Sequence, residues 1–114
     1  MEKSVLSSTF MISKEHPALP GHFPGHPVVP GVVLLEQVEQ QLQEAFQAYE
    51  IIKLTQAKFT HLVLPEQRIA LVIEILPGAD NITIKAKWRV TLEQDIVCAT
   101  GQFVLARKNE EGSL

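Results

Sequence analysis

The sequence has a single cysteine, Cys98, which excludes an internal disulfide bond and agrees with a reducing cytoplasm. Only 20% of the 114 residues are charged, the net charge is −3, and no long run of one sign occurs. A nucleic-acid-binding protein needs a clustered basic surface, so we do not expect one here. Neither a signal peptide nor an apolar run of membrane-spanning length is visible. We therefore expect a globular protein in the cytoplasm.

The apolar pattern predicts one helix and five strands. Pro30 and Gly31 open a segment whose apolar residues recur at helical spacing as far as Tyr49 or Glu50. Strands are predicted over residues 4–13, 52–62, 68–76, 81–92 and 96–106. A helix followed by an antiparallel meander predicts an α+β fold in which the apolar face of the sheet packs on the helix. We expect a single domain over residues 1–114, with a frayed polar tail over 107–114.

Alternation is clearest in the strand predicted over residues 81–92. One face carries Ile82, Ile84, Ala86, Trp88 and Val90, and the other carries Thr83, Lys85, Lys87 and Arg89. Such a pattern is typical of a half-buried antiparallel strand. Cys98 alternates inside the last strand and is predicted to be a small core residue.

The candidate catalytic residues lie in the stretch GHFPGHPVVPGVVLLEQVEQ, from Gly21 to Gln40. The prolines over residues 14–30 disfavour regular hydrogen bonding and predict a shaped loop. A helix that begins at Gly31 leaves its first N–H groups without intrahelical partners and carries partial positive charge at that end. Because glycine lets a ligand approach the backbone closely, this end suits a carbonyl oxygen that becomes negative.

Two titratable side chains flank this helix end. His22 would act as a base, since imidazole titrates near neutral pH. Glu36 lies near the apolar stripe of the helix, where partial burial would let it hold a proton, and Gln40 is four residues later, within hydrogen-bonding reach. Together they suit removal of a proton next to a carbonyl, stabilisation of the enolate oxygen by the helix end, and protonation of a leaving hydroxyl.

The string His22-Phe23-Pro24-Gly25-His26-Pro27, followed by Pro30-Gly31-Val32, Glu36 and Gln40, resembles the signature of the hot-dog 3-hydroxyacyl-(acyl carrier protein) dehydratases of the FabZ/FabA type. Ala57-Lys58-Phe59 with Leu64-Pro65-Glu66-Gln67 is similar to that family's KF…PGD segment. The resemblance implies a hot-dog fold, in which an antiparallel sheet wraps one long central helix, and a dimer with active sites at the subunit interface.

The resemblance also implies a role for each site residue. His22 would come from one subunit and Glu36 from the other. Gly31 would donate its backbone N–H to the thioester carbonyl, the Val28 carbonyl would orient the imidazole, and Gln40 would hold the carboxylate. The substrate implied is a 3-hydroxyacyl thioester on acyl carrier protein, the product is a trans-2-enoyl thioester, and neither a cofactor nor a metal is expected.

The chain departs from the housekeeping pattern in several ways, and Gln37, Val38 and Glu39 follow the acid where that family usually has small apolar residues. Glu66 and Gln67 replace the Gly-Asp of the PGD turn, and Lys58-Phe59-Thr60-His61 stands where the housekeeping enzymes tend to carry arginines. These differences resemble the small ApeI-like dehydratases of specialised acyl pathways such as aryl-polyene biosynthesis. A homodimer is expected, with a heterodimer of homologues as the alternative.

Other functions stay open at this point. A hot-dog thioesterase would use Glu36 to activate water, and a noncatalytic partner subunit would keep the fold without needing His22 and Glu36. The basic strand face with Lys85, Lys87 and Arg89 is either a solvated sheet face or a docking surface for the carrier protein.

Overall fold

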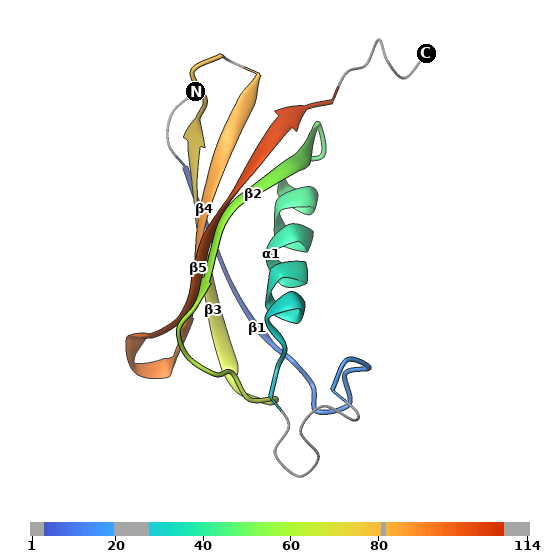
Figure 1. Cartoon of the computed structure of the whole chain (residues 1–114), viewed down its shortest axis with the longest axis vertical. Helices are drawn as coiled ribbons and strands as arrows, with labels where there is room; N and C mark the ends of the chain where they lie inside the picture. Colours follow the sequence, from blue (N-terminus) through green and yellow to red (C-terminus); the bar gives the residue numbers. More distant parts are fainter. Residues whose placement is uncertain (1–3, 20–27, 81, 109–114) are drawn as a thin grey trace.

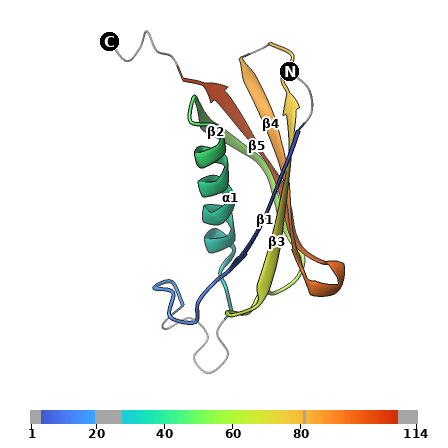
Figure 2. The same ribbon diagram turned by 180° about the vertical axis from the view of Figure 1, so that it is seen from behind.

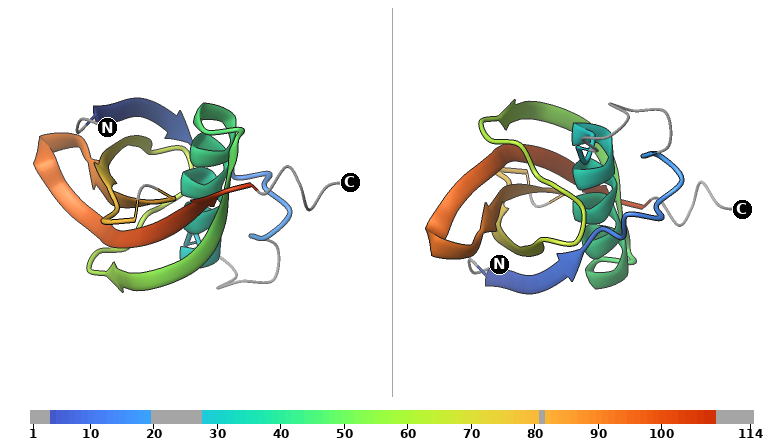
Figure 3. Two further views of the ribbon diagram at one scale, coloured as in Figure 1. Left: turned by 90° about the horizontal axis from the view of Figure 1, so that it is seen from above. Right: turned by 90° about the horizontal axis from the view of Figure 1, so that it is seen from below.

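One helix lies against one face of a five-stranded sheet in the computed structural model, which describes residues 4–19, 28–80 and 82–108. Strand β1 (Ser4–Met11) precedes helix α1 (Gly31–Ala45). The later elements are β2 (Tyr49–Phe59), β3 (Arg68–Pro77), β4 (Thr83–Leu92), a 3-10 turn (Glu93–Asp95) and β5 (Ile96–Arg107). All neighbouring strands are antiparallel, in the order β1-β3-β4-β5-β2. Figures 1 and 2 show α1 on one side of the sheet, and Figure 3 shows the sheet curving around it.

The core forms between α1 and the concave face of the sheet. Strands β3 and β4 alternate between buried and more exposed residues, which confirms the alternation predicted for β4. The buried residues of the central strands and the helix are Ile69, Leu71, Ile73, Ile75, Ile84, Ala86, Trp88, Val90, Val33, Leu34, Val38 and Leu42. Cys98 is fully buried among them, which confirms it as a core residue. The sheet therefore buries one face against one helical stripe, as the predicted α+β fold requires.

Helix α1 begins at Gly31 as predicted but ends at Ala45, earlier than the predicted end at Tyr49 or Glu50. Phe46 leaves the helical conformation at φ −128° and ψ 67°, and Tyr49 already begins β2. A tight turn explains the misleading pattern, because Tyr49 N–H donates to the Phe46 carbonyl and its ring packs edge-on against Phe46 at 6.1 Å. Tyr49 thus joins the apolar cluster without being helical. Among the described residues, no helix is long and apolar enough to cross a membrane.

Two predictions about residues near strand ends were also wrong. Ile82 is 56% exposed rather than part of the buried face of β4, because it lies before the first residue of that strand, Thr83. Arg107 is the last residue of β5, and Lys108 donates its N–H to the Ala48 carbonyl, so neither belongs to a frayed tail. Residues 109–114 of the predicted tail lie outside the described residues.

Candidate functional site

An apolar cavity of about 320 Å³ surrounds the N-terminus of α1. Residues from three segments line it: the approach to the helix, the first turn of α1, and the end of β2 with the chain that follows it. They include Val28, Pro30, Gly31, Leu34, Phe59 and His61. The cavity therefore brings together the helix start predicted from residues 30–31 and a segment far along the chain.

Gly31 lies where the helix opens to the cavity. Pro30 precedes it in an extended conformation (φ −63°, ψ 148°), and no side chain among the described residues caps the helix. The Phe59 ring lies so close that a Cβ on Gly31 would stand 3.0 Å from two of its carbons. The Phe59 ring therefore packs directly on Gly31, and any side chain at this position would have to displace it. The partial positive charge of the helix end then faces an apolar space that favours charge interactions.

Backbone hydrogen bonds fix the rim of the cavity. Val29 donates its N–H to the Val63 carbonyl at 2.8 Å, which ties the approach to α1 to the segment after β2. Thr60 and His61 both donate their N–H groups to the Cys98 carbonyl, at 2.8 Å and 3.3 Å. The rim is therefore built from hydrogen bonds between distant parts of the chain. Val28, predicted to orient the base, is half-buried and belongs to this rim.

His61 lines the cavity with an exposed side chain, although the sequence places it within the strand predicted over residues 52–62. It lies just beyond the end of β2, and its Nδ1 is 2.8 Å from the Leu62 carbonyl oxygen. Since a carbonyl can only accept, Nδ1 carries the hydrogen of this contact. Nothing local distinguishes His61 or Phe59 as cavity residues, because their position depends on how β2 pairs with β5 and meets α1.

His22 and His26 lie outside the described residues. Glu36 lies on α1 but is exposed and does not line the cavity, so the partial burial predicted for it is absent in the single chain. Gln40 donates its amide to Glu44 Oε2 at 3.4 Å, on the following turn, rather than to Glu36 as predicted. One chain therefore supplies the helix end and the cavity, and its own Glu36 points elsewhere.

Strand β2 is one edge of the sheet, and several of its apolar residues are exposed. Ile52, Leu54 and Phe59 are 53%, 43% and 47% exposed. Such a row beside a free strand edge is typical of a surface that another chain covers. The cavity lies at one end of this edge, through Phe59.

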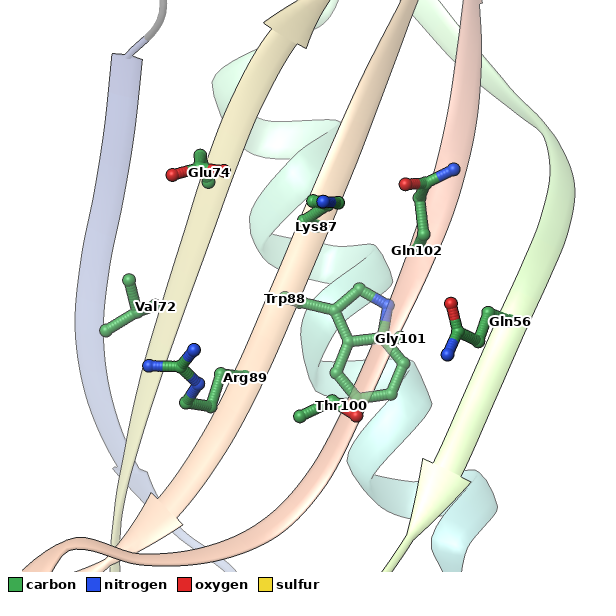
Figure 4. Close-up of a pocket in the computed structure, with 9 residues that line it drawn as sticks. All are labelled: Gln56, Val72, Glu74, Lys87, Trp88, Arg89, Thr100, Gly101 and Gln102. Atoms are coloured by element: carbon green, nitrogen blue, oxygen red, sulfur yellow. The ribbon is translucent and has the colours of Figure 1, made fainter.

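The face of the sheet opposite α1 carries a second, polar hollow of about 330 Å³. Figure 4 shows Lys87 and Arg89 there with Glu74, Thr100 and Gln102, with the helix behind the sheet. Lys85, Lys87 and Arg89 are all exposed, as predicted for one face of β4.

Comparisons with known proteins agree with this architecture. The model of the ApeI-like family, described as ApeI dehydratase, matches residues 1–102. The 3-hydroxyacyl-[acyl-carrier-protein] dehydratase FabZ of Mannheimia succiniciproducens is 32% identical over 102 residues, which cover 77% of this chain and 68% of that protein.

Solved structures share the fold at lower identity. The dehydratase heterocomplex ApeI:P from Xenorhabdus doucetiae matches with a TM-score of 0.72 and 18% identity, over 94% of this chain and 96% of that chain. The fluoroacetyl-CoA thioesterase FlK matches with a TM-score of 0.74 and 11% identity, over 96% and 89%. These likenesses concern the fold alone and confirm the predicted hot-dog architecture. On the strength of the family match, this chain belongs to the ApeI-like family of hot-dog dehydratases.

Proposed function

We propose that this protein removes water from a 3-hydroxyacyl thioester on acyl carrier protein to give a trans-2-enoyl thioester. The observation that carries the proposal is the apolar cavity beside the uncapped start of α1 at Gly31, in a chain of a dehydratase family. An acyl chain needs apolar walls, and a thioester carbonyl needs hydrogen-bond donors where negative charge develops. The aryl-polyene type of pathway and a cytoplasmic location are part of the same proposal.

The mechanism assigns one step to each group. His22 takes the proton from the carbon between the thioester and the hydroxyl-bearing carbon, and the Gly31 N–H stabilises the enolate oxygen. Glu36, in its protonated form, gives a proton to the hydroxyl as the carbon–oxygen bond breaks, so the leaving group departs as water. The Val28 carbonyl would orient the imidazole, and Gln40 would hold the carboxyl group after turning from Glu44.

A second subunit would complete the site. Glu36 is exposed and outside the cavity of its own chain, and the apolar edge of β2 ends beside that cavity. Pairing β2 with another copy would cover this edge and bring a second α1 near the cavity. We propose a homodimer, and a homologous chain could occupy the same position in a heterodimer. Replacing Ile52 with lysine should shift the protein from dimer to monomer in light scattering, whereas lysine at Val5 on the opposite edge should leave the dimer intact.

A row of polar residues, two of them basic, leads from the cavity across the outer face of the sheet. Lys58 pairs with Thr100, and Thr100 pairs with Arg89, so the three side chains share the face opposite α1. Neighbouring strands are about 4.8 Å apart, which puts the backbones of Lys58 and Arg89 about 10 Å apart. Lys58 adjoins Phe59, whose ring contacts Gly31. An acidic carrier protein could therefore bind this row while its thioester enters the cavity.

Charge reversal separates carrier docking from chemistry. Lys58→Glu and Arg89→Glu should raise KM for a carrier-bound substrate about tenfold, while kcat/KM for the same acyl group on coenzyme A stays within about twofold. Lys108→Glu, beyond the far end of β5, serves as the control. Equal effects on both substrates would remove the docking role of the row.

Product identity tests the proposed reaction. Mass spectrometry of a carrier-bound 3-hydroxyacyl thioester should show loss of water with the thioester intact. A free acid would instead establish thioester hydrolysis, and an unchanged substrate across short, long and aromatic tails would point to a noncatalytic subunit.

A further inference from the structure

His61 is the polar side chain of an otherwise apolar cavity. Every other described residue that lines the cavity beside the helix start, Gly31 and Phe59 among them, has an apolar side chain or none. The proposed dehydration uses the helix start and gives His61 no task. Apolar pockets fix and select their ligands through the few polar groups that they offer. Among the described lining residues, His61 is therefore the side chain able to select a ligand by a hydrogen bond.

Hydrogen bonds hold the chain on both sides of His61. The N–H groups of Thr60 and His61 donate to the carbonyl of the buried Cys98, at 2.8 Å and 3.3 Å. Two residues further on, the Val63 carbonyl accepts the Val29 N–H at 2.8 Å. An exposed histidine after the end of a strand is thus held at a defined place on the cavity wall. A group held in place before binding loses less entropy when a ligand binds to it.

The contact of Nδ1 decides what the imidazole offers to a ligand. Nδ1 lies 2.8 Å from the Leu62 carbonyl oxygen and carries the hydrogen of that contact. In the neutral ring Nε2 then carries a lone pair and can only accept. Since Nδ1 faces the Leu62 carbonyl, Nε2 lies on the side of the ring away from it. A neutral His61 therefore presents a hydrogen-bond acceptor to a donor in the cavity.

Distance selects the donor. The Phe59 ring packs on Gly31, and His61 follows Phe59 by two residues, so the Cα atoms of Phe59 and His61 are at most about 7 Å apart. A compact cavity of about 320 Å³ is about 8 to 9 Å across. Carrier protein and coenzyme A both present an acyl group on a pantetheine arm, whose first amide nitrogen is four bonds, or about 5 Å, from the thioester carbon.

The other polar groups of the arm lie further from the thioester. The second amide nitrogen is about 10 Å from the thioester carbon, and the phosphate is more than about 15 Å from it. With the thioester carbonyl at the Gly31 N–H, only the first amide lies well inside the cavity that Gly31 and His61 both line.

We propose that His61 binds the pantetheine arm of the substrate: its neutral Nε2 accepts the hydrogen bond of the amide N–H nearest the thioester. The role rests on the proposed function, because it takes the thioester carbonyl to lie at Gly31. His61 thereby distinguishes pantetheine-type thioesters from thioesters of simple thiols. The bond forms on the arm and away from the reacting atoms, so it is equally present in the ground state and the transition state. Its loss should raise KM and leave kcat unchanged.

Two small thioesters isolate this one hydrogen bond. Both carry the same 3-hydroxyacyl group, one on N-acetylcysteamine and the other on its carba analogue, in which a methylene group replaces the amide N–H. His61→Phe keeps a ring without the acceptor, and His61→Gln supplies a side-chain oxygen at a similar reach. His16→Phe is the matched control, because His16 is a half-buried histidine that does not line the cavity. All proteins are compared as full chains in their native assembly.

The expected result is a preference for the amide that depends on His61. In wild type the KM for the carba analogue should be about 3- to 10-fold higher than for the N-acetylcysteamine thioester, with kcat within about twofold. His61→Phe should show no preference between the two thioesters, and its KM for the carba analogue should match wild type. His61→Gln should restore part of the preference, and His16→Phe should keep all of it.

Several outcomes would overturn the role. Equal KM values for the two thioesters in wild type, or an unchanged preference in His61→Phe, would show that His61 does not bind this amide. A loss in His61→Phe that is the same for both thioesters would show damage to the cavity instead. An effect that appears only with 4′-phosphopantetheine thioesters would assign His61 to the phosphate and contradict the amide contact.

The two proposals fail in different ways. If the wild type removes water neither from these thioesters nor from a carrier-bound one, the proposed function fails and the role of His61 with it. An active wild type without a preference for the amide removes the role of His61 alone.

Discussion

Replacing Gly31 with alanine tests whether the helix end is the reacting part of the cavity. The new Cβ would stand 3.0 Å from Phe59 Cε1 and Cζ and 3.3 Å from Cε2. Carbon atoms prefer about 3.5 to 4.0 Å, so the ring must move by at least about 0.5 Å. Phe59 is half-exposed and able to move, and alanine favours the helix by up to about 1 kcal/mol over glycine. We therefore expect the free energy of unfolding to change by less than about 1 kcal/mol.

Activity should respond far more than stability. A donor at an oxyanion site contributes about 3 to 4 kcal/mol, and a methyl group with a displaced ring beside it should remove a third to a half of that. This amounts to about 1 to 2 kcal/mol, so the expected fall in kcat/KM is about 5- to 30-fold, measured as enoyl thioester formed from a carrier-bound substrate.

A second substitution checks the cause of this loss. If the crowded ring is responsible, Gly31→Ala combined with Phe59→Leu should recover part of the activity, so the two effects would be non-additive. Full activity in Gly31→Ala would refute the placement of the thioester carbonyl at this helix end. Losses that simply multiply in the double variant would refute the steric explanation.

Three further predictions concern stability. Gly101→Ala should lower the free energy of unfolding by about 3 kcal/mol in urea titrations, because its Cβ would overlap the buried Trp88 indole and lie 2.5 Å from the Gln56 carbonyl oxygen; a loss under about 1 kcal/mol would contradict this packing. Burial raises the pKa of the Cys98 thiol above its usual 9.0, so stability should decline as pH rises above about 9 and should not do so in Cys98→Ala. Hydrogen bonds from Thr83 and Ile82 hold the pKa of the Asp80 carboxyl below its usual 3.8, so stability should be lost as pH falls below that value, and Asp80→Asn should show a smaller loss.

Local pattern was sufficient for much of the fold. The alternation in β4 predicts its buried face from Ile84 to Val90, and the proline-glycine pair predicts the start of α1 at Gly31. These features depend on residue type and spacing within one element. The predicted end of α1 was wrong because Tyr49 continues the helical spacing of apolar residues, although the helix has already ended in a turn.

Less of the site than of the fold could be predicted from the sequence. The cavity depends on contacts between segments far apart in the chain, so Phe59 and His61 carry no local signal of their position. The sequence offers the Gln40 side chain two carboxylates at the same spacing, Glu36 four residues before it and Glu44 four residues after it. Glu36 was predicted as the hydrogen-bond partner, but in the structure the partner is Glu44. Glu66 shows the same limit, since its hydrogen bonds join it to residues more than fifty positions earlier.

The most direct test of the central claim is the rate of water loss from a carrier-bound 3-hydroxyacyl thioester with His22→Ala, with Glu36→Gln, and with the two proteins mixed under subunit exchange. Each variant alone should be slower than wild type by about a hundredfold or more, since acid–base groups contribute on that order. The mixture should regain a substantial fraction of the wild-type rate, because one site of each mixed dimer would hold both residues intact. Near-wild-type rates in either variant alone would contradict the dehydratase mechanism, and a mixture as inactive as its components would contradict the shared site.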